Sequence, residues 1–435
     1  MKRLALALCL LLSLTLPVLQ PSAGPLTLGG APSVALNVLD YPTFQAALDA
    51  LENQGGGTLE IPSGTYSPTT VPAFNGIVVP RNVSVHGQAR SIPTLKLTDP
   101  AATFIKFKEY AGTSGGLTIE NLFLEGPAVA GSGIGIDGFN SATSITQVVV
   151  RNTVIHNMPS WAVNLDTDNA SNFVEQVLFE GVTCYASKTN GSLKLGRVAV
   201  SGANVCSFVR CEFNGPSQFV GSGNNKYGTD SLLVGCVHIS HAGGGINFFG
   251  CSFQPSGFGE PGNSSPALSV ADITYGISLF GCYFESPGTG TTHWINTDAS
   301  SGCVAMNVSG CTFKRTVTSR GYQVLRAGNN GAIVGGTFSG CSFITSGTPA
   351  ADDIELGTSG NSDVCLVNNY YSGTRIQVSN ITAGTTWLEK GRVKLGSFNN
   401  AGEAAITNPQ NGELIYNSQT NFLRVYAAGA WRNAP

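Results

Sequence analysis

Short runs rich in β-branched and aromatic residues follow one another along most of the chain. They are separated by turns of Gly, Ser and Asn. Runs such as 148–151 and 277–280 are typical of strands, and no 3.6-residue helical period extends through the body of the chain. The pattern predicts a stack of short strands and turns.

A repeat organises these runs. The motif Gly-Cys-x-Phe begins at four positions that lie roughly 30 residues apart: Gly250, Gly281, Gly310 and Gly340. Looser copies begin at Asn152, Gly181, Arg210 and Asn368, and most units contain a second β-type run: 134–137, 162–166, 267–270, 322–325 and 354–356. A unit of about 30 residues with two or three strands predicts one coil of a parallel β-helix, in which each coil buries its inward residues against its neighbours.

The cysteines follow the same repeat. Stacking of equivalent positions predicts an inward ladder of five cysteines beside a ladder of phenylalanines: Cys211, Cys251, Cys282, Cys311 and Cys341. Stacked cysteines behave as small apolar side chains, so free buried thiols are favoured over disulfides. The chain between Cys236 and Cys251 is too short for a coil. Either Cys236 belongs to a different face, or residues 210–250 form one enlarged coil.

The amino terminus carries two further features. Residues 1–23 have a positive start at Lys2 and Arg3, an apolar run and small residues near Ala23, which predicts a secretory signal peptide and a secreted, extracellular protein. After a linker at 24–37, apolar residues at helical spacing and a Thr43 cap predict a helix over 43–52 that covers the first coil.

Composition narrows the range of partners. Charged residues make up only 11% of the chain and the net charge is −3 without a basic run, so no nucleic-acid partner is expected. No later stretch reaches the ~20 apolar residues of a membrane span. No cofactor or metal is expected; His238 and His241 lie close together in sequence, but without a clear third ligand.

One segment near the amino terminus resembles a known superfamily. Residues 41–50, followed by Gly55-Gly56-Gly57-Thr58-Leu59-Glu60-Ile61-Pro62-Ser63-Gly64-Thr65-Tyr66, are similar to the opening of pectate-lyase-like proteins, which include rhamnogalacturonase-like and epimerase-like enzymes and phage tailspikes. The resemblance covers roughly residues 38–390. It implies an all-β fold, a single-stranded right-handed parallel β-helix, and a polysaccharide partner. It does not imply catalysis, because this fold also serves adhesins.

The carboxyl-terminal region, 391–435, has a different pattern. Residues 409–418 and 422–431 read as a β-hairpin, and they resemble a small module of tail-fibre and bacterial surface proteins. That module often accompanies trimers, so the resemblance implies a homotrimer as one state of the protein.

The coil step suggests where chemistry lies. The sequence separation between Asn152 and Gly181 also relates Asp137 to Asp166 and Asp168 to Arg197, which predicts a catalytic group at the end of one strand stack: Asp137, Asp166, Asp168, Lys194 and Arg197. Two carboxylates suit a glycoside hydrolase, whereas a mixture with cations suits a polysaccharide lyase that neutralises a uronate and abstracts its α-proton. The alternative is that these aspartates bond turn amides, as Asp272 and Asp298 at the ends of other runs suggest.

Aromatic residues beside turns are candidates for stacking on sugar rings: Trp161, Tyr185, His293 and Trp294. Their alternative role is to cover the core. The triplet Asn296-Thr297-Asp298 is similar to a motif of polygalacturonase-type hydrolases, but the companion motifs are missing, so we interpret it as chance. Two functions remain open: a secreted polysaccharide-degrading enzyme, or a non-catalytic trimeric tailspike-like or adhesin-like carbohydrate-binding protein.

Overall fold

The computed structural model describes part of the chain. The described residues are 34–110, 113–129, 131–138, 144–167, 173–185, 191–197, 203–214, 236–240, 242–254, 267–271, 274–286, 294–298, 303–315, 325–327, 333–334, 336–345, 354–355, 364–371, 378–379, 386–388, 397–398, 400–404 and 414–433. The predicted signal peptide lies outside them.

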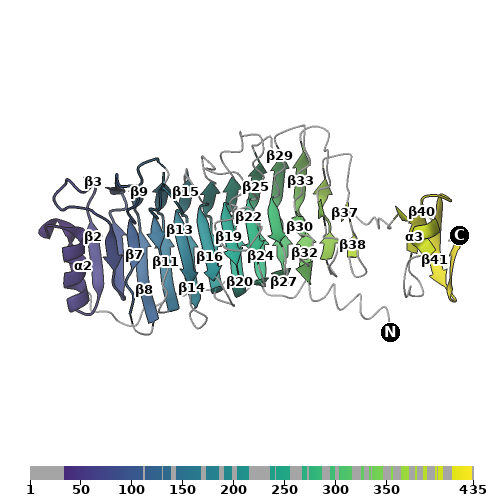
Figure 1. Ribbon diagram of the computed structural model, residues 1–435, viewed down its shortest axis with the longest axis horizontal. Helices are drawn as coiled ribbons and strands as arrows, with labels where there is room; N and C mark the ends of the chain where they lie inside the picture. Colours follow the sequence, from purple (N-terminus) through teal and green to yellow (C-terminus); the bar gives the residue numbers. More distant parts are fainter. Residues whose placement is uncertain are drawn as a thin grey trace.

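Three long parallel sheets run side by side along the molecule (Figure 1). Each coil passes through the sheets in the order A, B and C, and each strand pairs with its equivalents in the coils before and after. Sheet A has 13 described strands: β1 Ala35–Asn37, β2 Gly57–Ile61, β5 Val83–Gly87, β8 Thr113–Glu120, β11 Ser144–Arg151, β14 Val174–Glu180, β17 Ala203–Val209, β20 Ala242–Phe249, β24 Ile277–Phe280, β28 Asn307–Ser309, β32 Gly336–Ser339, β35 Val364–Val367 and β38 Thr386–Leu388. The predicted right-handed parallel β-helix is confirmed.

Sheets B and C have 11 described strands each. Sheet B consists of β3 Thr65–Tyr66, β6 Thr94–Lys96, β9 Phe123–Glu125, β12 Val154–His156, β15 Thr183–Tyr185, β18 Glu212–Asn214, β21 Ser252–Gln254, β25 Tyr283–Ser286, β29 Thr312–Arg315, β33 Ser342–Thr345 and β36 Tyr370–Tyr371. Sheet C consists of β4 Ile77–Val79, β7 Ile105–Phe107, β10 Ile136–Asp137, β13 Val163–Thr167, β16 Leu193–Arg197, β19 Val237–Ser240, β22 Leu268–Ala271, β26 Ile295–Asp298, β30 Leu325–Ala327, β34 Ile354–Glu355 and β37 Val378–Ser379. A further short sheet joins β23 Thr274–Tyr275, β27 Cys303–Val304 and β31 Ile333–Val334.

The recurring glycine of the motif forms the corner between sheets A and B. One residue there adopts a left-handed conformation in coil after coil, with φ between 45° and 61°: Asn121, Asn152, Gly181, Arg210, Gly250, Gly281, Gly310, Gly340 and Asn368. Glycine and asparagine tolerate this conformation best, which explains why those two residues dominate the position. The next residue points inward and begins the buried ladder.

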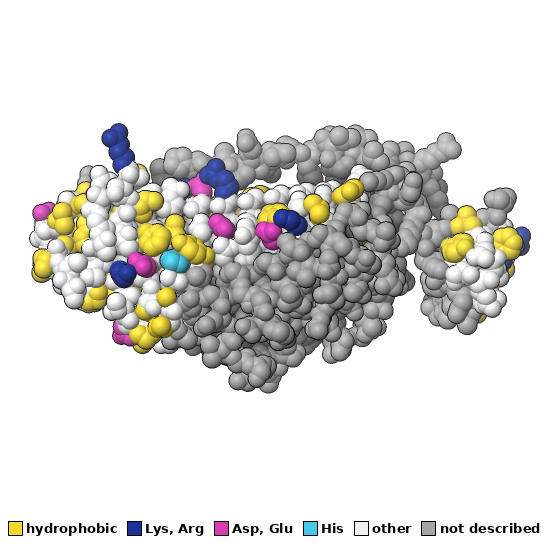
Figure 2. Space-filling view, turned by 90° about the horizontal axis from the view of Figure 1, so that it is seen from above, with side chains coloured by type: hydrophobic (Ala, Val, Ile, Leu, Met, Phe, Trp, Pro, Cys, Tyr) yellow, Lys and Arg dark blue, Asp and Glu magenta, His cyan; other side chains and the backbone are white. Residues whose placement is uncertain are grey.

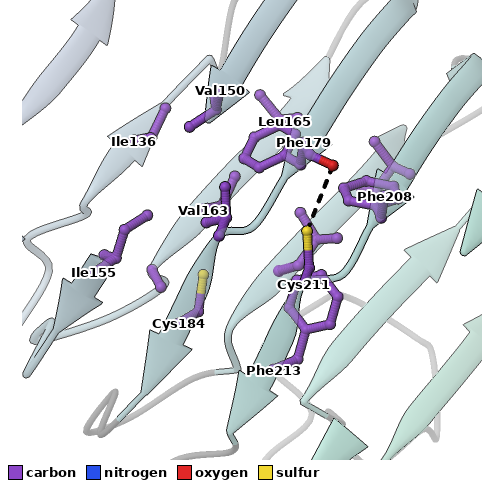
Figure 3. Close-up of a cluster of buried hydrophobic side chains, with 14 of the residues drawn as sticks. Ile136, Val150, Ile155, Val163, Leu165, Phe179, Cys184, Phe208, Cys211 and Phe213 are labelled. Carbon is purple, nitrogen blue, oxygen red and sulfur yellow. Dashed lines mark hydrogen bonds between the residues drawn. The ribbon is translucent and has the colours of Figure 1, made fainter. Parts of the chain in front are cut away.

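The inward cysteine and phenylalanine ladders are both confirmed. The five ladder cysteines are free and buried. Each thiol donates to a backbone carbonyl of the preceding coil, as Cys211 does to Phe179 O at 3.5 Å (Figure 3). Beside them, the rings of Phe253, Phe284 and Phe313 stack with centroids 4.5 and 4.8 Å apart. Burial raises the pKa of the Cys206 thiol, in sheet A, to about 12, and burial likewise raises that of Cys184. These thiols serve packing.

Two alternatives were given for the chain around Cys236: that it lies on another face, or that residues 210–250 form an enlarged coil. Both are confirmed. Cys236 directly precedes β19 and therefore belongs to sheet C, not to the ladder. The surrounding coil is also enlarged: Cys206 in β17 pairs with Ile246 in β20, a longer step along the chain than the one from Val177 to its partner Cys206.

The predicted amino-terminal helix is confirmed as α2, Phe44–Asn53. The Thr43 hydroxyl caps it by accepting the Ala46 amide at 3.1 Å, and the helix buries Phe44 and Leu48 at the start of the β-helix core (Figure 1). A short 3₁₀ helix, η1 Val38–Asp40, precedes it. Strand β1 lies within the predicted linker, so the β-helix begins before the expected boundary at residue 38.

An ion pair ties this helix to the second coil. Lys108 Nζ lies 2.6 Å from Glu52 Oε2, and the Tyr110 hydroxyl donates to Glu52 Oε1 at 2.9 Å. The hydrogen bond from Lys108 lowers the pKa of Glu52. The helix is therefore held both by its apolar face and by its charged edge.

The carboxyl-terminal segment forms its own small sheet, as predicted. Strands β40 Leu414–Asn417, β41 Phe422–Ala427 and β42 Ala430–Asn433 are antiparallel, and β39 Ser397–Phe398 pairs in parallel with β40. Helix α3, Asn400–Ala404, joins this sheet through Asn417, whose Nδ2 donates to Asn400 Oδ1 at 2.9 Å and to Glu403 Oε2 at 2.7 Å.

Candidate functional site

A row of polar residues lies on the outer face of sheet C. Strand residues alternate between the two faces, and Ile136, Val163 and Leu193 point inward into the core. The next residue on each of these strands therefore points outward. Cα register pairs Asp137 with Asn164, and Asn164 with Lys194. We call Asp137, Asn164 and Lys194 the sheet C row. Backbone register places Lys106 before it and His238 after it.

Two members of the row are joined by a hydrogen bond, and two of the three are buried. Asn164 Nδ2 donates a hydrogen bond to Asp137 Oδ1 at 3.0 Å. Asn164 is 7% exposed and Lys194 9% exposed, although both leave the sheet on the side away from the core. Lysine is almost never so buried without a partner, and Lys194 has interactions within the protein.

Asp137 accepts a hydrogen bond that crosses from one coil to the next, from Asn164 to Asp137 Oδ1. This bond ties β10 to the neighbouring strand β13. The catalytic role and the turn-bonding role of Asp137 both stay predictions.

The predicted register within the group is wrong by two positions for Asp137 and by one position for Arg197. Asp137 pairs with Asn164, and the expected partner Asp166 pairs with Gly196. Thr167, not Asp168, pairs with Arg197, and Asp168 lies outside the described residues. The backbone of Asp166 lies in β13 and that of Arg197 in β16. Of the predicted group, Asp137 and Lys194 share one outward row, two coils apart.

Asn164 is the residue that the sequence reasoning missed. It lies inside the predicted run 162–166, two positions before Asp166, where the constant coil step drew attention to the aspartate instead. A polar residue between the buried Val163 and Leu165 was the available signal, because it must lie on the outward face.

The aromatic residues predicted to stack on sugar rings differ from one another in their burial. Trp294 is 2% exposed and belongs to the core, with its ring centroid 5.8 Å from that of Phe313, and Trp161 is 3% exposed. The stacking role is wrong for Trp294 because its ring fills the interior. Tyr185 is half-buried on the outside of sheet B and stacks on His156 with centroids 4.2 Å apart. His293 lies outside the described residues.

Charged side chains elsewhere are scattered. Figure 2 shows acidic and basic side chains interspersed on the described part of one face. On sheet A, His86 lies between two carboxylates, with Nδ1 3.2 Å from Glu60 Oε1 and Nε2 3.1 Å from Glu120 Oε1. Across the described ranges, no three His, Cys, Asp or Glu side chains are arranged to hold a metal ion. No helix within the same ranges is long and apolar enough to cross a membrane.

The fold defines the class of this protein: a right-handed parallel β-helix. No protein-family model matches the chain, and no curated protein matches it at a significant level. Among solved structures, the A-module of the mannuronan C-5 epimerase AlgE4 from Azotobacter vinelandii is similar, with 14% identity, a TM-score of 0.54, and 81% of this chain and 100% of that chain covered.

Two further solved structures are similar at lower scores. Tailspike protein 2 of bacteriophage CBA120 has 11% identity and a TM-score of 0.49, with 88% of this chain and 56% of that chain covered. The catalytic unit of a GH87 α-1,3-glucanase from Streptomyces thermodiastaticus has 11% identity and a TM-score of 0.43, with 83% and 68% covered. At these identities the likeness concerns the fold alone.

Proposed function

We propose that the protein acts outside the cytoplasm on an acidic polysaccharide, which it binds along the sheet C row. The observation that carries this proposal is the register of a carboxylate, an amide and a buried ammonium on three successive coils: Asp137, Asn164 and Lys194. The amino-terminal apolar leader predicted from residues 1–23 supports export. The similar epimerase module is named for its action on mannuronan, which supports a polysaccharide as the ligand.

The row suits proton abstraction better than hydrolysis. Glycoside hydrolysis needs two carboxylates on either side of the bond, whereas the row offers one carboxylate and one ammonium. Lys194 would neutralise the uronate carboxylate, which acidifies the adjacent C–H, and Asp137 would accept that proton. The electron pair would form a double bond as the neighbouring C–O bond breaks, and the leaving oxygen would take a proton from water. The reaction class is therefore a polysaccharide lyase.

The first experiment is a survey of acidic and neutral polysaccharides with purified protein. New reducing ends and ultraviolet-absorbing unsaturated ends are followed together. The proposal expects both signals on a uronate polymer and neither on neutral polymers. Reducing ends without unsaturation would indicate a hydrolase, and would place a second carboxylate such as Asp166 in the reaction. Silence with retained binding would support the alternative below.

The second candidate function is a trimeric, non-catalytic carbohydrate-binding spike or adhesin. One observation favours it. On the carboxyl-terminal sheet, Tyr416 and Leu423 are cross-strand partners on one face, each 38% exposed. Phe422, which is 51% exposed, points to the opposite face. Exposed apolar residues clustered on a small sheet are typical of an association surface. Light scattering after size-exclusion chromatography tests this: Leu423→Ser should convert a trimer to monomers, while Thr420→Ser in the adjoining turn should not.

A further inference from the structure

A stack of aromatic rings ends on the outer face of sheet B. His156 in β12 and Tyr185 in β15 are in register on adjacent coils, and their rings stack with centroids 4.2 Å apart and planes 24° from parallel. Phe123 lies on the other side of His156, with ring centroids 6.0 Å apart. His156 therefore covers one face of the Tyr185 ring, and the opposite face is turned towards the next coil, which contains β18.

Two amides continue the row where the rings stop. The register of sheet B places Asn214 in β18 beside Tyr185, and Gln254 in β21 follows Asn214. Asn214 Nδ2 donates to Glu212 Oε1 at 3.0 Å, and Gln254 Nε2 donates to Ser252 Oγ at 2.9 Å. Each amide is thus turned along its own strand and away from the ring of Tyr185.

These side chains form a polar floor that is two coils long. Its four residues, which we call the sheet B shelf, are all half-buried on the outer face: Glu212, Asn214, Ser252 and Gln254. Tyr185 bounds the shelf at one end. At the other end lies Glu285 in β25, whose Oε1 is 3.1 Å from Lys314 Nζ. Tyr185 and Glu285 are three coil steps apart, roughly 14 Å at the Cα level.

The charges of the shelf indicate which ligand it can take. Its one ionisable side chain is the carboxylate of Glu212, and the nearby cation Lys314 is already paired with Glu285. A uronate would be repelled by Glu212 and would find no cation within the shelf. A neutral sugar offers hydroxyl groups that donate to a carboxylate or an amide oxygen, and an apolar ring face that can pack on an aromatic ring. Figure 2 looks onto the side of the molecule where Figure 1 places β15, β25 and β29, and its described surface carries only scattered charges.

We propose that the sheet B shelf is a second carbohydrate site, which binds a neutral sugar unit stacked on Tyr185 and hydrogen-bonded to Glu212 and Gln254. The site is separate from the sheet C row and does not depend on it. The length of the shelf suits a short stretch of a polymer better than a single sugar. One aromatic ring and a few hydrogen bonds give a low affinity, so binding here is weaker than that of a uronate polymer on the sheet C row.

Calorimetric titration with defined oligosaccharides tests the site. The neutral probes are maltohexaose, cellohexaose, xylohexaose and mannohexaose, and the acidic probe is hexagalacturonate. The wild type is compared with Tyr185→Ala, Tyr185→Phe and Glu212→Gln. Phe249→Ala is the matched control, because Phe249 also stacks on a ring of the adjacent coil, with centroids 5.2 Å from Phe280, but lies on sheet A. Thermal unfolding of each protein shows whether the fold is kept.

The wild-type protein should bind at least one neutral hexasaccharide. Tyr185→Ala should lower that affinity about tenfold through loss of the ring, and Glu212→Gln should also lower it through loss of the charged acceptor. Tyr185→Phe and Phe249→Ala should bind as the wild type does. Absence of wild-type binding to all four neutral probes, or an unchanged affinity in Tyr185→Ala, would overturn the proposal. The proposed function is judged on hexagalacturonate instead: if only that probe fails to bind, the sheet C proposal fails and the shelf stands.

Discussion

The side chain of Asn369 occupies the ladder position that follows Cys341 and accepts the Cys341 backbone amide at 2.9 Å through its Oδ1. Its Nδ2 donates to Phe338 O at 3.2 Å, and the residue is 1% exposed. Where the cysteine ladder ends, an amide thus accepts the Cys341 N–H and supplies a side-chain donor to the Phe338 carbonyl.

Replacing this amide should destabilise the carboxyl-terminal coils. Asn369→Leu removes the acceptor of the buried Cys341 N–H, at about 1–3 kcal/mol, and also removes the side-chain donor to the Phe338 carbonyl. Asn368→Gly is the matched control, because that neighbour adopts a φ of 51° that glycine readily accepts. Denaturant unfolding should show a clear loss for the first variant and little change for the second. Equal stability of the two variants would contradict this account of the ladder end.

The ladder thiols should be free but unreactive in the native protein. Nine described cysteines are free, and eight of them are buried, with Cys365 half-buried. A thiol reagent at neutral pH should therefore modify at most Cys365 among these nine. Unfolding in denaturant without a reductant should make all nine react. If the unfolded protein still did not react with the reagent at these positions, the cysteines would be paired as disulfides.

Alkaline pH should weaken the fold through buried thiols. Burial raises the pKa of Cys206 from 9.0 to about 12, so the unfolded chain loses this proton at a lower pH than the native protein. The stabilisation is complete below about pH 9 and is lost as pH rises towards 12, at up to ~1.4 kcal/mol per pH unit for one group. In unfolding measured across this range, Cys206→Ala should show a shallower decline. An identical slope would show that Cys206 titrates normally.

The corner between sheets A and B sets a strict backbone requirement. Gly310 has a φ of 61°, and an added Cβ would meet no atom within 4 Å, so a substitution there costs conformational energy without a clash. Gly310→Ala should lose about 1–2 kcal/mol. Gly310→Asn should lose less, because Asn152 and Asn368 occupy the equivalent corner. Matched urea unfolding curves of the two variants test this order.

The sequence predicted the repeat correctly at the corner between sheets A and B, but it did not predict the strand register of sheet C. The difference has a physical reason. At the corner, a left-handed residue, an inward cysteine and an inward phenylalanine recur with nearly constant spacing, so the motif from Gly250 to Gly340 reveals the period directly. Sheet C is entered and left through connections whose lengths vary. The chain between Lys194 and its partner His238 is much longer than the chain between Asp137 and its partner Asn164.

A constant coil step could therefore place Asp137 and Asp166 on one sheet but not opposite their true partners. Asp137 and Lys194 were predicted as members of one site, and they do share one outward row. Asn164 was missed because its importance comes from a register that only the fold reveals. The burial of Trp294 likewise depends on the neighbouring coil that supplies Phe313.

The central claim is that the sheet C row recognises the carboxylates of an acidic polysaccharide, and one comparison tests it most directly. Calorimetric titration of the wild-type protein is performed with a uronate polymer and with the same polymer after chemical reduction of its carboxylates to alcohols. The account predicts binding of the first and at least a tenfold loss of affinity for the second. Equal affinity for both polymers would contradict it.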